Sequence, residues 1–448
     1  MALAALLTGA GAIRLVGVQY GLPFPLLNPD EANIVPRAWR MAHGGGLDPD
    51  WFDYPSLLMY VLAPFQIWAD EPDYLTARLV VVGLGLAGIA AAWWLGDRAY
   101  DVVAGVVAAT ATAVATVHVE YSRMAVTDVP LALGVTVSLA LLVRRQLLPA
   151  GIAIGLTASF KYPGFVLLVP LLVAGWGRWR PLAVSTVLAL AAFLVTSPYF
   201  VVHLGSAVGD VLRVQRDGRR GWLGFEDDPW TPIAFVDRLW EGIGPVLLIA
   251  LGGLALALAR RTLADRVLAA FVVAYFLTLL PLDAHFDRYV LPLIPPLGAL
   301  AGRFRALAPV TLLLLVIPVV WSIRETRPLV HTDTRVLAHD WIDRNVTPGV
   351  LVAADPSTAA PADVRVLRLA LPGPGRRPDP ERSLERLRRL NVGYVLVTGA
   401  VADRVRRQAR RYPAEARFYD ELERAGNRRF YRRGVGRLAG PWVAVYEL

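Results

Sequence analysis

Cysteine is absent from this chain of 448 residues. Its absence excludes disulfides, thiolate catalysis, zinc–thiolate sites and iron–sulfur clusters, and leaves the redox compartment undetermined. Charge is also sparse, since charged residues are 19% of the chain, against about 25% in an ordinary soluble domain. Lysine occurs only at Lys161, so the formal net charge of +9 comes from arginine.

Apolar residues take the place of the missing charge. They make up 55% of the chain and give a mean hydropathy of +0.46. They fall in blocks of about 15–22 residues, close to the ~20 that a helix needs to cross a membrane. We therefore expect about eleven membrane-spanning helices, at 2–20, 78–96, 102–118, 126–143, 147–160, 162–175, 182–201, 243–259, 265–282, 288–302 and 306–323. The first block lacks a basic start, so we interpret it as a retained span rather than a cleaved leader.

Arginines in alternate short loops predict the orientation. They are Arg98, Arg144 and Arg145, Arg178 and Arg180, Arg260 and Arg261, and Arg303 and Arg305. The positive-inside rule places these loops in the cytoplasm. This placement explains the positive net charge better than binding to nucleic acid does. The shorter apolar stretch 55–69 is then an interfacial helix, because a crossing there would put the arginines outside. The outer side receives 21–77, 118–125, 159–163, 202–240, 283–287 and all residues after 323.

Two further features complete the predicted fold. Residues 147–160 and 162–175 are short for spans, and we predict two helices meeting at Lys161 on the outer face, because an unpaired lysine in mid-membrane costs several kcal/mol. Residues 324–448 lack a long apolar run. TDTRVLAHDWIDRNV predicts a helix, and VLVAAD, YVLVTG and GPWVAVYEL predict strands. The fold class is thus mainly α: a polytopic membrane helix bundle (1–323) with a small extracytoplasmic α/β domain (324–448).

Polar clusters in the first outer loop are the first candidates for chemistry. Asp30 and Glu31 are adjacent carboxylates close to the membrane, a place where ionisable groups are commonly functional. They suit proton transfer from a hydroxyl or help in holding a divalent cation. The alternative is a helix N-cap. Tyr54 lies in WFDYPSLL, where simple anchoring in an interfacial aromatic belt is the alternative.

The later outer loops carry further candidates. His118, Glu120, Arg123 and Asp128 fall within HVEYSRMAVTDVP. Carboxylates with a histidine suit a metal, and Asp30, Glu120 and Asp128 are the weak metal candidates; the planar fork of Arg123 suits phosphate. A cluster of ion pairs that fixes helix packing is the alternative.

Two more outer segments have basic residues. Lys161, followed by Tyr162, suits a lipid phosphate or reaches the headgroups merely by snorkelling. His285, Arg288 and Tyr289 lie in DAHFDRYVLPLIP, where Arg288 suits a phosphate or pyrophosphate or takes part in an interface cluster. In the loop 202–240, Trp222 and Trp230 suit stacking on a sugar, with a solvated loop as the alternative.

The order of these segments resembles GT-C fold glycosyltransferases, in particular the protein O-mannosyltransferase and aminoarabinose-transferase-like group, family 39. YSRMAVTDVPLAL and DRYVLPLIPPLGAL carry the resemblance. It implies inverting transfer of a sugar from a polyprenyl-phosphate donor to a lipid, glycan or protein acceptor at the outer face. Asp30 matches the catalytic aspartate and Glu31 completes the pair. Asp128 matches a second acidic position, and Lys161 and Arg288 match basic positions near the lipid phosphate.

One departure from that group concerns its His-Pro-Pro-Leu motif, where this chain reads Tyr54-Pro55-Ser56-Leu57. A requirement for Mg²⁺ or Mn²⁺ is left open. The resulting hypothesis is an outward-facing glycosyltransferase of a bacterial plasma membrane, in contact with membrane lipids. Its alternatives are a transporter or flippase of polyprenyl-linked lipids and a non-catalytic membrane scaffold. The expected substrate contacts are Tyr54, Arg123, Asp128, Lys161, Tyr162, His285, Arg288 and Tyr289.

Overall fold

The computed structural model describes residues 2–359 and 364–448 and divides the chain into two compact units. Unit 1 consists of Met1–Val18, Asp30–Arg216 and Pro229–Arg327. Unit 2 consists of Gln19–Pro29, Asp217–Asp228 and Pro328–Leu448. Two short pieces of predicted outer loops thus belong to the same unit as the C-terminal segment.

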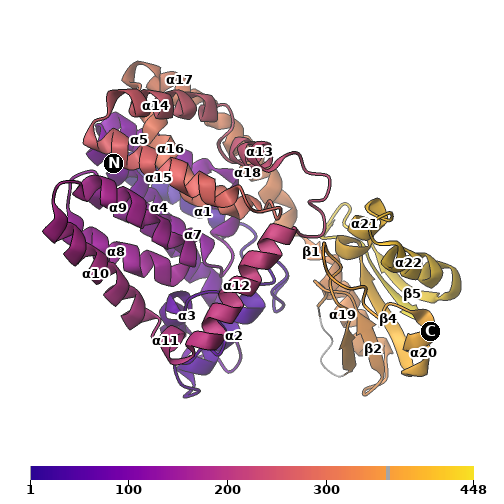
Figure 1. Ribbon diagram of the computed structural model, residues 1–448. Helices are drawn as coiled ribbons and strands as arrows, with labels where there is room; N and C mark the ends of the chain where they lie inside the picture. Colours follow the sequence, from indigo (N-terminus) through magenta and orange to yellow (C-terminus); the bar gives the residue numbers. More distant parts are fainter. Residues whose placement is uncertain (1, 360–363) are drawn as a thin grey trace. The chain divides into compact units, whose positions relative to one another are not determined.

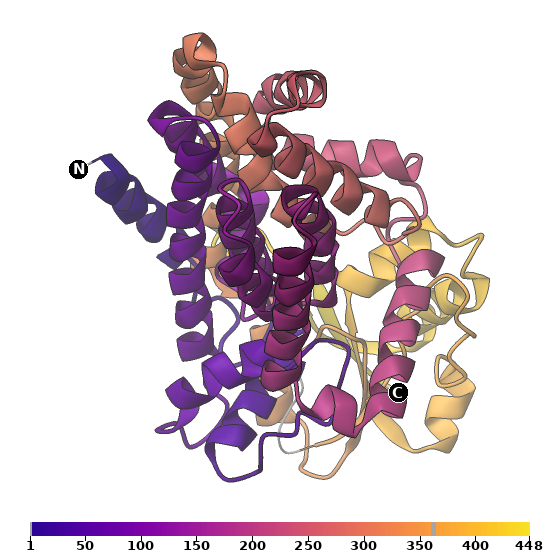
Figure 2. The ribbon, with the colours of Figure 1, turned by 60° about the vertical axis from the view of Figure 1, so that its left-hand side comes forward.

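Unit 1 is built from helices. Neighbouring helices pack in sequence: α4 contacts α5 and α7, α7 contacts α8, and α8 contacts α10 (Figures 1 and 2). The helices are α1 (Ala2–Leu15), α2 (Glu31–Ala42), α3 (Leu57–Leu62), η1 (Ala63–Gln66), α4 (Tyr74–Ala99), α5 (Val102–Val114), α6 (Thr116–Tyr121), α7 (Asp128–Leu142), α8 (Leu147–Phe160), η2 (Tyr162–Leu167), α9 (Leu168–Gly175), α10 (Trp179–Thr196), α11 (Tyr199–Val202), α12 (Leu204–Arg220), α13 (Thr231–Ile243), α14 (Val246–Arg260), α15 (Leu263–Leu279), η3 (Asp287–Leu293), α16 (Ile294–Gly302), η4 (Arg305–Leu307), α17 (Ala308–Leu314) and α18 (Val316–Thr326).

Capping side chains explain where several of these helices begin. The carboxylate of Asp73 accepts a hydrogen bond from the Thr76 amide at the start of α4, and Asp101 does the same for Ala104 in α5. Both residues have extended backbone, as an N-cap requires. The long apolar runs therefore begin at acidic caps just outside the apolar sequence.

Some of these helices are long and apolar enough to cross a membrane. Within the described residues they are α4, α10 and the helical run Arg305–Val330, or four spans if the bent pair α13 and α14 forms one. Six further apolar helices have 10–17 residues, and 14 residues reach only about 21 Å. The chain is a multi-pass membrane protein, and the expected eleven crossings stay a prediction for the shorter helices.

Several predicted boundaries were wrong. The block 2–20 forms a helix only to Leu15, and the block 102–118 is interrupted at Ala115, whose extended ψ of 123° separates α5 from α6. The block 243–259 is preceded by α13, and the two helices are bent by 117°. The predicted outer loop 202–240 contains α12 and most of α13, because a search for apolar blocks does not detect amphipathic helices.

The predicted break at Lys161 is confirmed. Lys161 has φ −157° and ψ 133°, which is extended backbone between α8 and η2. The stretch 55–69 is likewise a short helical segment, α3 and η1, rather than a span-length helix.

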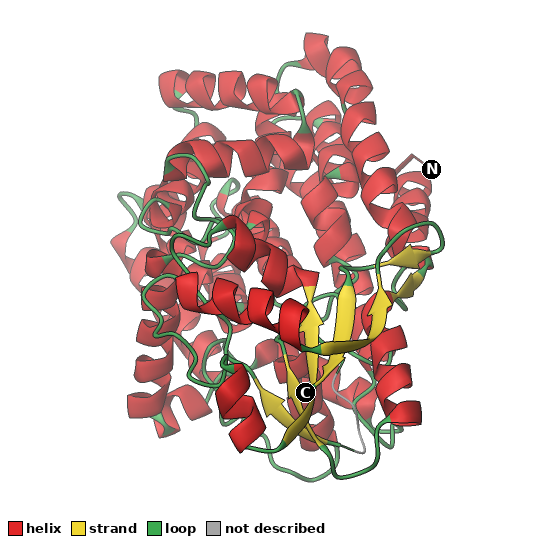
Figure 3. Cartoon of the chain, turned by 90° about the vertical axis from the view of Figure 1, so that its right-hand side faces the viewer, coloured by secondary structure: helices red, strands yellow, loops and turns green. Residues whose placement is uncertain are grey.

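Unit 2 is a mixed sheet covered on both faces (Figure 3). Its main sheet has the order β3-β2-β4-β7-β5, parallel between β3, β2 and β4 and antiparallel at β7. The predicted helix and three strands are confirmed as α19, β2, β4 and β7. The elements are η5 (Arg327–Val330), β1 (Thr332–Asp333), α19 (Thr334–Asn345), β2 (Leu351–Ala354), β3 (Arg365–Arg368), α20 (Leu384–Arg389), β4 (Val392–Thr398), α21 (Gly399–Arg407), α22 (Pro413–Ala425), β5 (Asn427–Arg432), β6 (Leu438–Ala439) and β7 (Val443–Glu447).

Alternating side chains on β4 explain the two layers of helices. Val395 and Val397 pack in one core with residues of α20, α21 and α22. Leu396 packs in a second core with Ala338 and Ile342 of α19. A strand that is apolar on both faces is what a sheet with two covered faces requires.

Candidate active site

Asp30 lies at the start of α2 and joins side chains from two distant segments. Its Oδ2 accepts a hydrogen bond of 2.9 Å from the Tyr54 hydroxyl. The same oxygen forms an ion pair with Arg288 Nη1 at 2.8 Å. Tyr54 precedes α3, and Arg288 is in η3. Residues 258 positions apart in the sequence therefore meet at one carboxylate.

The position of Asp30 is that of an N-cap, but its side chain does not serve as one. Asp30 has a helical backbone (φ −66°, ψ −26°) and makes no side-chain capping hydrogen bond to α2. A carboxylate that caps a helix would accept from the amides of the first turn. The capping explanation of Asp30 is thus wrong, and its side chain is directed to Tyr54 and Arg288 instead.

Lys161 and Asp128 form a second ion pair close by. Lys161 Nζ lies 2.6 Å from Asp128 Oδ1, and both side chains are buried. Asp128 begins α7, where the helix dipole favours a negative charge. Lys161 Nζ also lies 5.3 Å from the centre of the Tyr54 ring and 5.4 Å from that of Tyr289.

We call Asp30, Tyr54, Asp128, Lys161, Arg288 and Tyr289 the central cluster. It contains two cations, two carboxylates and two phenols from five different segments. Within the described part of the chain, Asp128 Oδ2 and Arg288 Nε are buried without a hydrogen-bond partner. An unsatisfied buried polar atom costs about 1–3 kcal/mol, so the cluster has unused hydrogen-bonding capacity of the kind that a bound polar ligand satisfies.

Tyr54 is the phenol that bridges the cluster. Burial raises its pKa well above the usual value, and the negative charge of Asp30 raises it further. Its hydroxyl therefore keeps its proton at neutral pH and acts as a donor to Asp30. The phenol and Arg288 together fix the direction of the Asp30 carboxylate.

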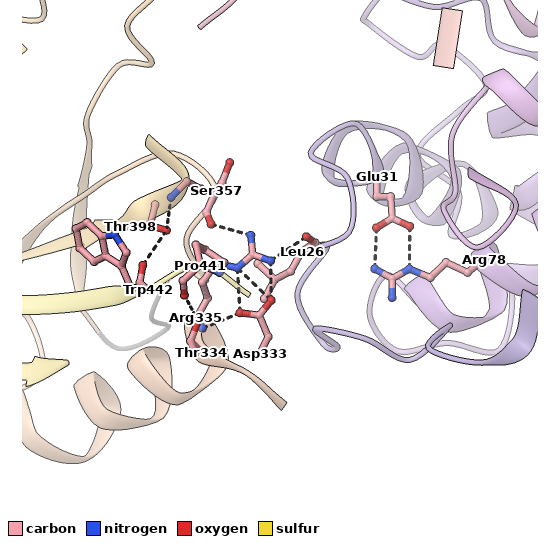
Figure 4. A network of polar contacts seen from close by, with 11 residues as sticks. Leu26, Glu31, Arg78, Asp333, Thr334, Arg335, Ser357, Thr398, Pro441 and Trp442 are labelled. Carbon is pink, nitrogen blue, oxygen red and sulfur yellow. Dashed lines mark hydrogen bonds and ion pairs between the residues drawn. The ribbon is translucent and has the colours of Figure 1, made fainter. Parts of the chain in front are cut away.

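Glu31, the neighbour of Asp30, has different surroundings (Figure 4). Its two carboxylate oxygens accept hydrogen bonds of 2.8 and 2.7 Å from Arg78 of α4, and neither side chain is exposed. One of these oxygens also accepts from the Ala125 amide in the segment between α6 and α7. The predicted catalytic role of Glu31 does not fit this burial, and the geometry favours a structural one.

Two other predicted substrate contacts, Arg123 and His285, have side-chain partners outside the central cluster. Arg123 is buried and donates to the Ile13 carbonyl and the Thr326 hydroxyl. His285 is buried beside Thr231 and the Phe235 ring. Each of these side chains joins helices, as the alternative of an interface cluster proposed.

Tyr162 contacts the loop that leads to Tyr54 of the central cluster. Its hydroxyl donates to the Phe52 carbonyl at 2.9 Å, two residues before Tyr54. Tyr162 therefore supports the loop that carries Tyr54, and its own hydroxyl is directed away from the central cluster.

The candidate metal ligands do not form a cation site in this arrangement. Among residues 2–359 and 364–448, no group of three or more His, Asp or Glu side chains is placed to hold a metal ion. Asp30 and Asp128 are each paired with a cation. These two carboxylates, each already paired with a cation, therefore do not fit a site for Mg²⁺ or Mn²⁺.

Comparison with known protein families assigns the chain to one of them. The model of glycosyltransferase family 87 matches residues 51–282, which is more than half of the chain. The chain belongs to glycosyltransferase family 87. It is therefore an enzyme, and the resemblance to GT-C glycosyltransferases is confirmed, with family 87 as the family whose model matches. No curated protein sequence matches this enzyme.

Solved structures share the fold of this family 87 enzyme. ArnT from Cupriavidus metallidurans in the apo state has a TM-score of 0.61 and 15% identity, covering 99% of this chain and 97% of that one. The same protein bound to undecaprenyl phosphate has a TM-score of 0.59 and 16% identity over the same shares. The oligosaccharyltransferase AglB from Archaeoglobus fulgidus, with an inhibitory peptide and a dolichol-phosphate, has a TM-score of 0.58 and 14% identity, covering 96% and 73%.

Sequence reasoning missed two polar contacts of this enzyme. Arg78 lies within an apolar block, and only the rarity of buried arginine could have marked it. The Tyr121 hydroxyl donates to Asp287 Oδ1 at 2.8 Å, and the Arg288 amide donates to the same oxygen. Asp287 thus fixes the backbone of the residue that pairs with Asp30.

The two loop tryptophans of the enzyme have separate surroundings. In unit 2 the Arg376 guanidinium lies 4.4 Å from the centre of the Trp222 ring, so a cation already occupies that face. Trp230 precedes α13 and is 75% exposed. Stacking of a sugar on Trp230 stays a prediction.

Proposed function

We propose that the enzyme transfers a sugar from a polyprenyl-phosphate donor to an acceptor hydroxyl at the outer membrane face, with inversion. The observation that carries the proposal is the central cluster, in which Lys161 and Arg288 place two positive charges beside Asp30. One phosphate would be bound by these cations, and a carboxylate beside them would accept a proton. The relative bound to undecaprenyl phosphate has the same fold over nearly its whole length.

In this proposal Asp30 is the general base. The acceptor oxygen attacks the anomeric carbon as the bond from that carbon to the phosphate oxygen breaks, and the acceptor proton passes to the Asp30 carboxylate. The polyprenyl phosphate leaves with the bonding electrons on its oxygen. A single displacement from the opposite face inverts the anomeric configuration.

Lys161 and Arg288 act on the leaving phosphate. Fixed cations at the place where negative charge develops are often the largest contribution to catalysis. Arg288 is held by Asp30 and Lys161 by Asp128, so both cations are already oriented when the donor arrives. The unused Nε of Arg288 is a donor for a phosphate oxygen.

Membership of family 87 separates this proposal from the alternatives of a flippase and a scaffold. Within the family, the specific claim of the proposal is that the donor is a polyprenyl-phosphate sugar. Purified enzyme in lipid nanodiscs is incubated with radiolabelled polyprenyl-phosphate hexoses and pentoses, and separately with nucleotide sugars, together with lipid, glycan and peptide acceptors. We expect a labelled product from at least one polyprenyl donor. Transfer from nucleotide sugars alone would overturn the proposal.

The outward orientation has its own test, because the chain has no native cysteine. Glu71→Cys in the first outer loop and Arg305→Cys in a predicted cytoplasmic loop replace exposed residues. A membrane-impermeant maleimide should label Glu71→Cys in intact cells and Arg305→Cys only after permeabilisation. The reverse pattern would put the central cluster at the inner face and refute the outward orientation.

A further inference from the structure

The helix α12 has an exposed face whose character changes along its length. Leu204, Val208 and Leu212 are 52%, 42% and 60% exposed. Their spacing of four residues places them on one side of the helix. Arg216 and Arg219 follow on the exposed surface of the last turns. The first half of this face is therefore apolar and the second half is basic.

The opposite side of α12 is attached to unit 1. Ala207 is fully buried, and the Asp210 carboxylate accepts a hydrogen bond from the Phe52 amide. Arg213 forms an ion pair with Asp53 at 2.5 Å. These contacts fix which side of the helix is turned outward, and they leave the apolar residues without protein cover.

The exposed apolar surface begins before α12, on a helix long enough to cross a membrane. In α10, Val184, Val187, Leu190, Leu194 and Val195 are exposed, and only 17% of its apolar window is buried. Val201 and Val202 of α11 continue the exposed apolar series. Figure 1 shows that α12 then turns away from the direction of α10 instead of extending it. The amphipathic helix α12, turned in this way where a span ends, has the arrangement of a helix that lies along a membrane surface.

We infer that α12 is an interfacial helix that docks on anionic phospholipid headgroups at the membrane surface where α10 emerges. Leu204, Val208 and Leu212 enter the boundary between acyl chains and headgroups, as the apolar face of an amphipathic helix does. Arg216 and Arg219 lie at the phosphates, where basic residues near an anionic surface are attracted to it. Continuity with the exposed face of α10 and complementary charge both favour lipid over a protein partner.

This contact has a consequence for the enzyme. Asp210 and Arg213 of α12 hold Phe52 and Asp53, which immediately precede Tyr54. The surface contact of α12 therefore helps to set the position of the loop that contributes Tyr54 to the central cluster.

Single-cysteine labelling tests the inference directly. Val208→Cys carries an environment-sensitive fluorophore on the proposed lipid face, and Ser206→Cys carries it at an exposed position on the other side of the same helix. The full-length protein is placed in nanodiscs of phosphatidylcholine with or without phosphatidylglycerol, and lipids with a quencher near the headgroup are added. We expect at least threefold stronger quenching at Val208 than at Ser206, and a further increase with phosphatidylglycerol.

The charge component has a separate control. In the Val208→Cys background, Arg216→Glu/Arg219→Glu should abolish the increase due to phosphatidylglycerol while the protein still elutes as a folded species. Equal quenching at the two positions would overturn the inference. So would a Val208 probe protected from both lipid-borne and aqueous quenchers, since that result would mean that protein covers the face.

Discussion

Glu31 and Arg78 form an ion pair with two hydrogen bonds in which neither side chain is exposed. Arg78 also donates to the Val18 carbonyl, and Glu31 also accepts from the Ala125 amide. The pair thus connects α2 and α4 with Val18, which follows α1, and with the segment between α6 and α7. Because Asp30 directly precedes Glu31, this connection holds the backbone from which the Asp30 side chain extends.

Removing one member of the pair should destabilise the protein strongly. In Glu31→Gln, Arg78 keeps its charge without a carboxylate partner, and breaking a buried ion pair in this way costs about 3–5 kcal/mol. Thermal unfolding of purified protein in nanodiscs measures the change. The double variant Glu31→Leu/Arg78→Met should be more stable than either single variant, because no charge is left unpaired.

The matched control is the ion pair between Glu385 and Arg389 of α20, whose side chains are 75% and 74% exposed. Glu385→Gln should cost less than about 1 kcal/mol, because exposed pairs are screened by water. If Glu31→Gln costs no more than this control, the pair does not hold the start of α2.

Replacement of Asp30 tests the base. Asp30→Asn keeps the size and the hydrogen bond from Tyr54 but cannot accept the acceptor proton. Loss of a general base typically reduces the rate about 10²–10⁴-fold, and we expect a decrease of this size in kcat with donor binding retained. Turnover is measured with the polyprenyl-phosphate donor that the wild type accepts.

Glu71→Gln is the control for Asp30→Asn, since it removes an exposed carboxylate from the same predicted outer loop. Its turnover should equal that of the wild type. An Asp30→Asn variant with near-normal kcat and an unchanged unfolding temperature would exclude Asp30 as the base.

Replacement of Lys161 tests the phosphate contact. A hydrogen bond to a charged group contributes about 1.5–3 kcal/mol, so Lys161→Gln should weaken binding of polyprenyl phosphate about 10–100-fold. Equilibrium binding at several salt concentrations measures it, and the salt dependence should decrease with the lost charge. Asp128→Asn/Lys161→Gln should recover stability but not affinity, which separates the ligand contact from the ion pair.

A second buried pair provides the control for Lys161. Arg303 and Asp265 lie 3.0 Å apart at the end of α16 and the start of α15. Arg303→Gln also leaves a buried carboxylate unpaired, but it should lower stability without changing affinity for the donor. Equal losses of affinity in the two variants would mean that Lys161 acts only through folding.

The sequence could predict the central cluster better than the helices around it. Arginines in alternate loops predict which ends of the apolar blocks share a membrane face. This constraint brought Asp30, Asp128, Lys161 and Arg288 into consideration together. Apolar composition alone does not limit helix length, however. The helix α5 therefore ends earlier than its apolar block, because the non-helical residue Ala115 interrupts it, whereas the break at Lys161 falls between two predicted blocks.

The different roles of Asp30 and Glu31 could not be predicted from their adjacency. Successive residues at a helix start point about 100° apart, so one carboxylate turns to Tyr54 and Arg288 while the other turns to Arg78 of α4. Which of them is buried depends on the packing of α2 against α4. That packing is a contact between segments 47 residues apart, and no local pattern encodes it.

Glu120 provides a prediction about pH. This partly buried residue lies in the last turn of α6 near Asp287, Arg123 and Glu325. Burial, followed by the charge of Asp287, raises the pKa of its carboxyl from 4.5 to about 8, against the opposing effect of Arg123. Between these pH values the folded protein holds a proton that the unfolded chain has released. Stability therefore falls as the pH rises through this window, and the loss is complete above about pH 8.

Glu120→Gln cannot ionise, so its stability should not show this decrease. We expect the unfolding temperatures of the variant and the wild type to converge near pH 4.5, and the variant to unfold at the higher temperature at pH 8 and above. Thermal unfolding in nanodiscs from pH 4.5 to pH 9 measures both curves, with Glu71→Gln as the exposed carboxylate control. Parallel curves for Glu120→Gln and the wild type would show that Glu120 is ionised in the folded protein across the whole range.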